Sequence, residues 1–96
     1  MDRVDDAAVD AAVAGSGWTR EGGRLRHRSR HGGFTGALAF VNAVGRLAEE
    51  RDHHPDIALH WDTVELELWT HSAGGITRAD LDLAAAVSAL EGAREA

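Results

Sequence analysis

The longest helical pattern in this chain, residues 34–51, separates two groups of shorter segments. Its apolar side chains recur at steps of three and four residues, the spacing of one helix face. Gly32-Gly33 precedes the pattern and Pro55 follows its end, and both residue types interrupt regular helices. We therefore expect a core helix here, whose aromatic side chains serve packing.

Strand and helix patterns alternate on both sides of this core helix. Four segments are typical of strands: residues 18–20, 24–30, 57–61 and 63–70. Helices are expected over residues 3–14, with a stripe made mostly of alanine, and over residues 77–91, opened by a capping box from Thr77 to Asp80. Short turns within each strand pair favour antiparallel pairing. The predicted fold class is α+β, a four-stranded antiparallel sheet with three helices on one face.

Composition and charge limit the classes of function. Ninety-six residues predict a single domain spanning residues 1–96, and a small core of this kind would gain from forming an oligomer. The formal net charge of −6 argues against a nucleic-acid partner. There is no cysteine, no apolar run long enough for a membrane span, and an acidic start unlike a signal peptide. We expect a cytoplasmic protein with no membrane partner.

The second strand segment, residues 24–30, is strongly basic. Leu25 is its only large apolar side chain, and four arginines and a histidine surround it. One interpretation is an edge strand that its charge keeps soluble. The other is a binding site for an anionic group.

Four of the six histidines lie between residues 53 and 71. His53 and His54 are adjacent, and Pro55 restricts the backbone before it. His71 falls where a strand gives way to a loop, a common place for functional side chains. Histidine is the side chain most readily used as an acid or base near neutral pH. From spacing alone three interpretations stay open: a pocket for a small organic substrate, a metal site, or a structural or interface role.

The order of these residues resembles the signature of one enzyme family, the pterin-4a-carbinolamine dehydratases. That signature is a glutamate, a His-His-Pro triplet, a tryptophan, a third histidine and an aspartate, here Glu49, His53-His54-Pro55, Trp61, His71 and Asp80. The sequence from Val64 through Asp80 is similar to the family nearly throughout, and the resemblance covers about residues 15–90. One stretch departs from it, because Ser29 and His31 stand where the family usually has aromatic residues.

The resemblance implies a function and a set of site residues. The implied reaction is loss of water from 4a-hydroxytetrahydropterin to give quinonoid dihydropterin, with no cofactor and no metal. His53, His54 and His71 would form the acid–base set. The remaining candidate residues, implied to bind or orient the substrate or the histidines, are Asp80, Glu49, Pro55, Thr70 and Ser72. Asp80 could orient His71, or it could only cap the helix that begins after Thr77.

Expected partners follow from the same resemblance. They are the pterin substrate, further copies of the chain in a homodimer or homotetramer, and a pterin-dependent hydroxylase. The alternative is a non-catalytic relative that acts as a dimerisation or assembly partner of another protein. Retention of all three histidines favours the enzyme, whereas the altered second strand favours the alternative.

Overall fold

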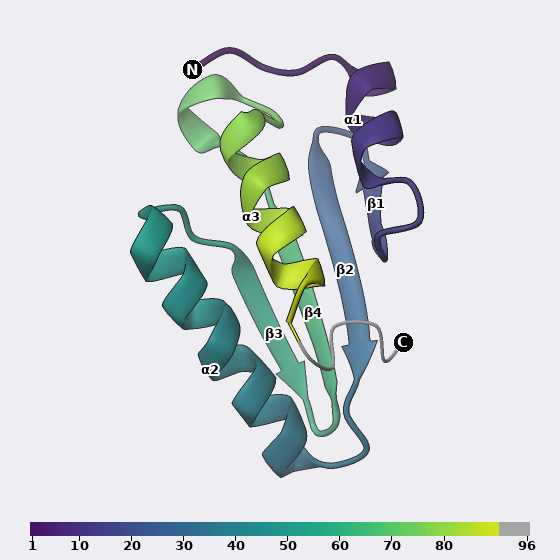
Figure 1. Cartoon of the computed structure of the whole chain (residues 1–96), viewed down its shortest axis with the longest axis vertical. Coiled ribbons are helices and arrows are strands. Elements are labelled where there is room, and N and C mark those ends of the chain that lie inside the picture. The colour runs from purple at the N-terminus through teal and green to yellow at the C-terminus, as the bar shows by residue number, and fades with distance from the viewer. Residues whose placement is uncertain (91–96) are drawn as a thin grey trace.

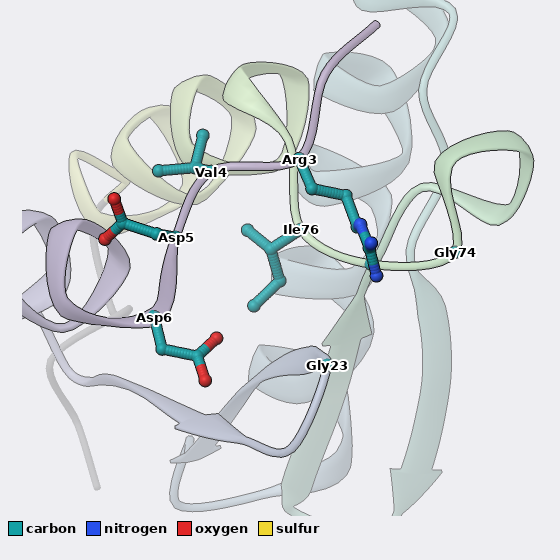
Figure 2. Close-up of a pocket in the computed structure, with 8 residues that line it drawn as sticks. Arg3, Val4, Asp5, Asp6, Gly23, Gly74 and Ile76 are labelled. Atoms are coloured by element: carbon teal, nitrogen blue, oxygen red, sulfur yellow. The ribbon is translucent and has the colours of Figure 1, made fainter.

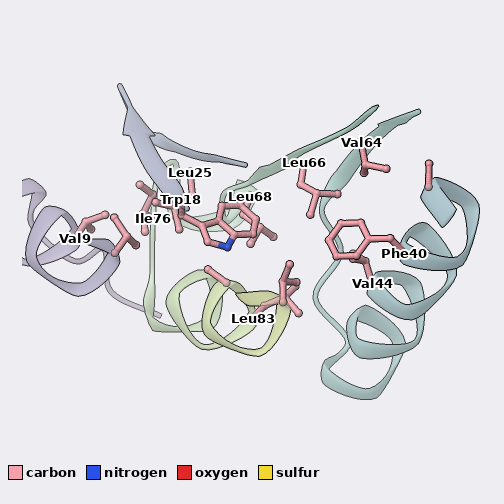
Figure 3. Close-up of a cluster of buried hydrophobic side chains, with 14 residues drawn as sticks. Val9, Trp18, Leu25, Phe40, Val44, Val64, Leu66, Leu68, Ile76 and Leu83 are labelled. Carbon is pink, nitrogen blue, oxygen red and sulfur yellow. The ribbon is translucent and has the colours of Figure 1, made fainter. Parts of the chain in front are cut away.

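The computed structural model describes residues 1–90. Within them the chain forms α1 (Asp6–Val13), β1 (Trp18–Glu21), β2 (Arg24–Arg30), α2 (Phe34–Arg51), β3 (Asp56–His60), β4 (Thr63–Leu68), a short 3₁₀ turn η1 (His71–Ala73) and α3 (Arg78–Ser88). The strands form one antiparallel sheet in the order β1-β2-β4-β3. All three α-helices lie on one face of that sheet (Figures 1 and 3). The predicted fold class is confirmed.

The core lies between the sheet and the helices because alternate strand residues are apolar. Val64, Leu66 and Leu68 of β4 all point inward and are buried, as the alternation predicted. Side chains from all three α-helices and from β1, β2 and β4 meet there, and the partly buried Leu59 of β3 packs against them. Figure 3 shows Leu83 of α3 beneath Trp18 and Leu68. This cluster fixes α3 across the middle of the sheet.

Several predicted boundaries move by a few residues. The first helix begins at residue 6 rather than 3 because the Asp5 carboxylate caps it, accepting from the Ala8 N–H at 2.9 Å. Its buried residues are Val9 and Val13, so the predicted alanine stripe is wrong. The third strand ends at His60, and Trp61 forms the turn with a φ of 51° and 67% exposure. The last helix ends at Ser88, and predicted end residue 91 lies outside the described residues.

Strand β2 occupies the centre of the sheet, so the prediction of an edge strand is wrong. Its arginines all point to the outer face, away from the helices, while Leu25, His27 and Ser29 are buried on the inner face. On the outer face Glu67 binds Arg24 at 2.5 Å and Arg26 at 2.6 Å. Acidic partners on β4 therefore stabilise the basic strand inside the sheet.

Histidine and serine side chains pack beneath β2. The His27 ring lies 5.0 Å from that of Trp18, and the His31 ring stacks on Phe40 at 4.7 Å. The Ser29 hydroxyl is 2.7 Å from Nε2 of His31. Imidazole rings and one hydroxyl thus fill the space, so this stretch of unusual sequence has a packing role. Phe34, expected in the core, is 49% exposed at the first position of α2.

The β3–β4 turn holds a carboxylate whose ionisation contributes to stability. Burial alone would raise the pKa of Asp62, but hydrogen bonds from Thr63 and Arg30, with the Arg30 charge, lower that pKa below its ordinary value of 3.8. Because the pKa of Asp62 is lower in the folded chain than in the unfolded chain, its ionised carboxylate stabilises the fold at pH values above the unfolded pKa. That stabilisation is lost as the pH falls through the folded pKa.

We expect Asp62→Asn to reduce the free energy of unfolding at neutral pH, and we expect its difference from the wild type to shrink as the pH falls and the wild-type Asp62 carboxylate becomes protonated. Urea unfolding at several pH values measures the difference. A difference that persists unchanged in acid would contradict this role of the Asp62 charge.

Candidate active site

The residues singled out by the sequence gather at one end of the sheet. The C-terminal end of α2, the start of β3, the end of β4 and the start of α3 all lie there (Figure 1). His53 and His54 follow α2, and His71 follows β4. Trp61 of the same motif is at the opposite end of β3, about 17 Å away by strand length. The tertiary structure therefore separates this tryptophan from the histidines.

The Asp80 carboxylate is the centre of a buried network. Asp80 and Thr77 are fully buried. The Oδ1 atom of Asp80 lies 2.5 Å from Nε2 of His53, and Oδ2 accepts from the Thr70 hydroxyl at 2.7 Å and from the Thr77 N–H at 2.8 Å. Asp80 thus caps α3, one of the two roles expected from the sequence. It also binds a histidine, but that histidine is His53 and not the expected His71.

The proton positions in this network follow from counting donors. Because the Thr70 hydroxyl donates to Asp80, it accepts from the Thr77 hydroxyl, 2.8 Å away. Because the Asp80 carboxylate accepts hydrogen bonds at both oxygens, Nε2 of His53 carries a hydrogen and donates it to Oδ1. Nδ1 of His53 makes no hydrogen bond with any described residue, and the side chain is 17% exposed. In neutral His53 this Nδ1 is the nitrogen able to accept a proton.

The end of α2 directs the two adjacent histidines differently. Asp52 adopts a left-handed conformation, with φ 48° and ψ 43°, and the N–H of His53 returns to the Ala48 carbonyl at 3.1 Å. His53 consequently turns inward. His54 stays exposed, and its Nε2 atom lies 2.5 Å from Oε2 of Glu49. The Glu49 carboxylate therefore pairs with a candidate histidine, and both side chains are exposed.

His71 belongs to a small loop that closes on itself. Thr70 and Gly75 pair through two backbone hydrogen bonds, 2.9 and 3.3 Å long, and the N–H of Gly74 bonds to the His71 carbonyl. The N-terminal segment runs along this loop, with the Val4 N–H bonded to the Ile76 carbonyl (Figure 2). A hollow of about 620 Å³ lies between that segment and the Gly74–Ile76 stretch.

Gly74 is a position where glycine matters. Its φ of 68° is left-handed, so an alanine there is expected to cost about 1–2 kcal/mol of unfolding free energy. Gly45 provides the matched control, because it is helical with open space around its Cα, and Gly45→Ala should stabilise by about 0.5–1 kcal/mol. Thermal and urea unfolding of both variants measure the effects. Equal effects of the same sign would contradict the strain at Gly74.

The remaining predicted residues have clear positions. Pro55 is half-buried between His54 and β3, and Ser72 is exposed in η1 without a side-chain hydrogen bond to any described residue. The ring contact of His71 is with Trp69, at 3.9 Å between centroids. Sequence reasoning missed two contributors, Thr77 as a second hydroxyl in the Asp80 network and Trp69 as the neighbour of His71. The capping box was the available signal for Thr77, and the two-residue alternation that puts Trp69 and His71 on one strand face was the signal for Trp69.

Over residues 1–90 no group of three His, Asp or Glu side chains is arranged to hold a metal ion. In the same range no helix has both the length and the apolar character needed to cross a bilayer.

An α+β fold with imidazoles paired to carboxylates at one end of its sheet defines a candidate acid–base site. The family model described as pterin 4 alpha carbinolamine dehydratase matches residues 2–90. This chain therefore belongs to the pterin-4a-carbinolamine dehydratase family.

Curated relatives agree with this assignment. A Roseiflexus sp. (strain RS-1) protein, provisionally named a pterin-4-alpha-carbinolamine dehydratase, is 45% identical over 85% of this chain and 89% of its own length. A Thermosynechococcus vestitus protein with the same provisional name is 40% identical over 93% of this chain and 95% of its own.

Two solved structures share the fold. One, described as a transcriptional coactivator/pterin dehydratase from Brucella melitensis, has a TM-score of 0.86 and 25% identity, covering 92% of this chain and 97% of that one. The other, described as a pterin dehydratase-like RuBisCO assembly factor of the alpha-carboxysome, has a TM-score of 0.63 and 26% identity over 82% of this chain and 89% of that one.

Proposed function

We propose that this protein is a 4a-hydroxytetrahydropterin dehydratase that uses His53, His54 and His71 as its acid–base set in tetrahydropterin recycling. The observation that carries the proposal is the His53–Asp80 pair, in which a fully buried carboxylate holds an imidazole whose other nitrogen is free. A histidine with only a packing role does not need a buried charge behind it. The family assignment and the provisional names of the relatives support the same reaction class.

The chemistry needs one proton donor and one proton acceptor. The C4a–O bond breaks as the hydroxyl takes a proton and leaves as water, while the N5 proton is removed and a C4a=N5 double bond forms. Positioned acid–base groups of this kind typically contribute about 10²- to 10⁴-fold to a rate. Asp80 and Glu49 orient His53 and His54 for these transfers.

Binding of the pterin is assigned to the loop beside the third histidine. Backbone groups of residues 70–75, together with Thr70 and Ser72, would meet the amide-like edge of the ring, since polar ligand sites often use main-chain groups. Pro55 would restrict the backbone that carries His54. No cofactor and no metal take part in this proposal.

The test is the decay of freshly generated 4a-hydroxytetrahydropterin, followed by ultraviolet absorbance. Wild type should accelerate it, and His54→Ala should lower that acceleration by about a hundredfold or more with the fold intact. His60→Ala is the matched control, because His60 is also exposed and paired with a glutamate, Glu65 at 3.1 Å, but lies at the other end of β3. Equal losses in the two variants would exclude a specific role for His54.

The second candidate function is non-catalytic assembly with another protein. It is favoured by one observation: the solved relatives include one described as an assembly factor and one as a transcriptional coactivator. No acceleration by folded wild type would sink the enzyme proposal and leave this one, with the arginine-rich outer face of β2 as the first surface to search.

Self-association and location complete the proposal. Leu38 of α2 and Ile57 of β3 are about 40% exposed, and a groove of about 590 Å³ beside Ile57 runs between these two elements. Exposed apolar surface of this kind supports a homodimer or homotetramer, which light scattering would detect.

The proposed setting is the cytoplasm, with a pterin-dependent hydroxylase supplying the substrate.

A further inference from the structure

The three candidate histidines differ in what holds their rings. His53 is bound by Asp80 and His54 by Glu49. His71 is exposed, and neither of its ring nitrogens hydrogen-bonds to a residue in the described part of the chain. The contact that restrains its ring is aromatic: the Trp69 ring lies 3.9 Å away between centroids, tilted by 33°. His71 thus depends on a stack where the others depend on carboxylates.

Trp69 is itself held by a cation. Leu25 pairs with Leu68, a register that puts Arg24 beside Trp69 on the outer face of the sheet. The guanidinium carbon of Arg24 lies 4.4 Å from the centre of the Trp69 ring, a distance typical of a cation–π contact. The indole N–H of Trp69 is buried and finds no acceptor among the described residues, so ring-face contacts and not a hydrogen bond fix this side chain.

Arg24 is fixed in turn by its acidic neighbour. One oxygen of Glu67 binds Arg24 at 2.5 Å and the other binds Arg26 at 2.6 Å, and the Glu67 side chain is only 14% exposed. A connected series therefore runs from the charged outer face of β2 and β4 to the histidine loop: Glu67, Arg24, Trp69 and His71. Arg24 of the basic strand and Trp69 after β4 thus belong to one arrangement.

We infer that Trp69, held in place by Arg24, is a positioning residue for His71 in the dehydration reaction, an inference that rests on the proposed function. An exposed histidine samples several rotamers, and a proton transfer requires one of them. Stacking on a fixed indole face selects one ring orientation before substrate binds. Misplacement by about 1 Å can cost up to about a hundredfold in rate, so loss of the stack should lower kcat more than it changes KM.

The experiment compares four variants of the full chain. Trp69→Leu removes the aromatic face, Trp69→Phe keeps it, and Arg24→Gln removes the cation that holds it. Trp61→Leu is the matched control, because that tryptophan is 67% exposed in the turn at the other end of the sheet. The readouts are kcat and KM of dehydration, and the NMR shifts of the His71 ring protons, which the current of a stacked indole displaces.

We expect Trp69→Leu to lose the ring-current shift of His71 and to lower kcat about tenfold or more, with KM changed less than kcat. Trp69→Phe should restore most of kcat, Arg24→Gln should fall between the two, and Trp61→Leu should match wild type. A folded Trp69→Leu variant with wild-type kcat, or with His71 resonances still at their wild-type positions, overturns the inference.

Failure of the inference and failure of the proposed function give different results. If wild type accelerates dehydration and Trp69→Leu does so equally, only the positioning role of Trp69 is wrong. If wild type shows no acceleration, the proposed function is wrong and the positioning role falls with it, even where the ring-current shift is present. A variant that loses the far-ultraviolet circular dichroism of the wild type is replaced by Trp69→Phe and Arg24→Gln, whose kcat values then decide.

Discussion

Asp80→Ala is expected to lower the free energy of unfolding by about 3–5 kcal/mol and to remove most of the dehydration activity. The carboxylate is fully buried and accepts hydrogen bonds from His53, Thr70 and the Thr77 backbone. Removing it leaves all three donors without their acceptor, and each buried donor without a partner costs about 1–3 kcal/mol. It also removes the acidic side of the capping box that begins α3.

Urea unfolding and the dehydration assay together test this prediction. Asp80→Asn separates the two effects, because the amide keeps the volume and one acceptor oxygen but turns its single NH₂ group toward donors around it. It should lose less stability than Asp80→Ala and still lose activity. Asp82→Ala is the control, since Asp82 is exposed on the same helix. If Asp80→Ala unfolds like Asp82→Ala, the buried network contributes nothing to stability.

Leu83→Ala is expected to cost about 2–5 kcal/mol, a large share of the about 5–15 kcal/mol typical of a small domain. Leu83 is fully buried where α3 crosses the sheet, beneath Trp18 and Leu68 (Figure 3). The lost apolar contact and the cavity that remains both contribute, because a packed core relaxes only partly around a missing side chain. The start of α3, which carries Asp80, depends on this packing for its position.

Thermal and urea unfolding measure the loss, and Leu38→Ala is the matched control. Leu38 is 41% exposed on α2, so the same chemical change there should cost less than about 1 kcal/mol. Equal losses at the two positions at low protein concentration would contradict the assignment of Leu83 to the core. A loss at Leu38 that grows with protein concentration would instead place Leu38 in an interface between copies.

Some of the site could be predicted from the sequence because its signals are local. The capping box from Thr77 to Asp80 spans four residues, and the helix start was predicted correctly from it. The contact between Asp80 and His53 joins residues 27 positions apart, and the sequence suggested His71 as the partner instead. Nearness along the chain was a poor guide, because the ring of His71, nine positions from Asp80, hydrogen-bonds to no residue in the described part of the chain.

The sequence by itself determined the types of the elements, the inward side of β4 and the identity of the candidate histidines. These depend on the period of apolar residues, on glycine and proline breaks and on residue chemistry, all of which act over a few positions. Only the tertiary structure decided that β2 lies at the centre of the sheet, that Asp80 holds His53 and that Arg24 covers Trp69. The physical reason is that antiparallel pairing of β2 with β4 joins segments about forty residues apart. Burial of the apolar face that the two strands share selects this pairing, and no local sequence pattern encodes which strands pair.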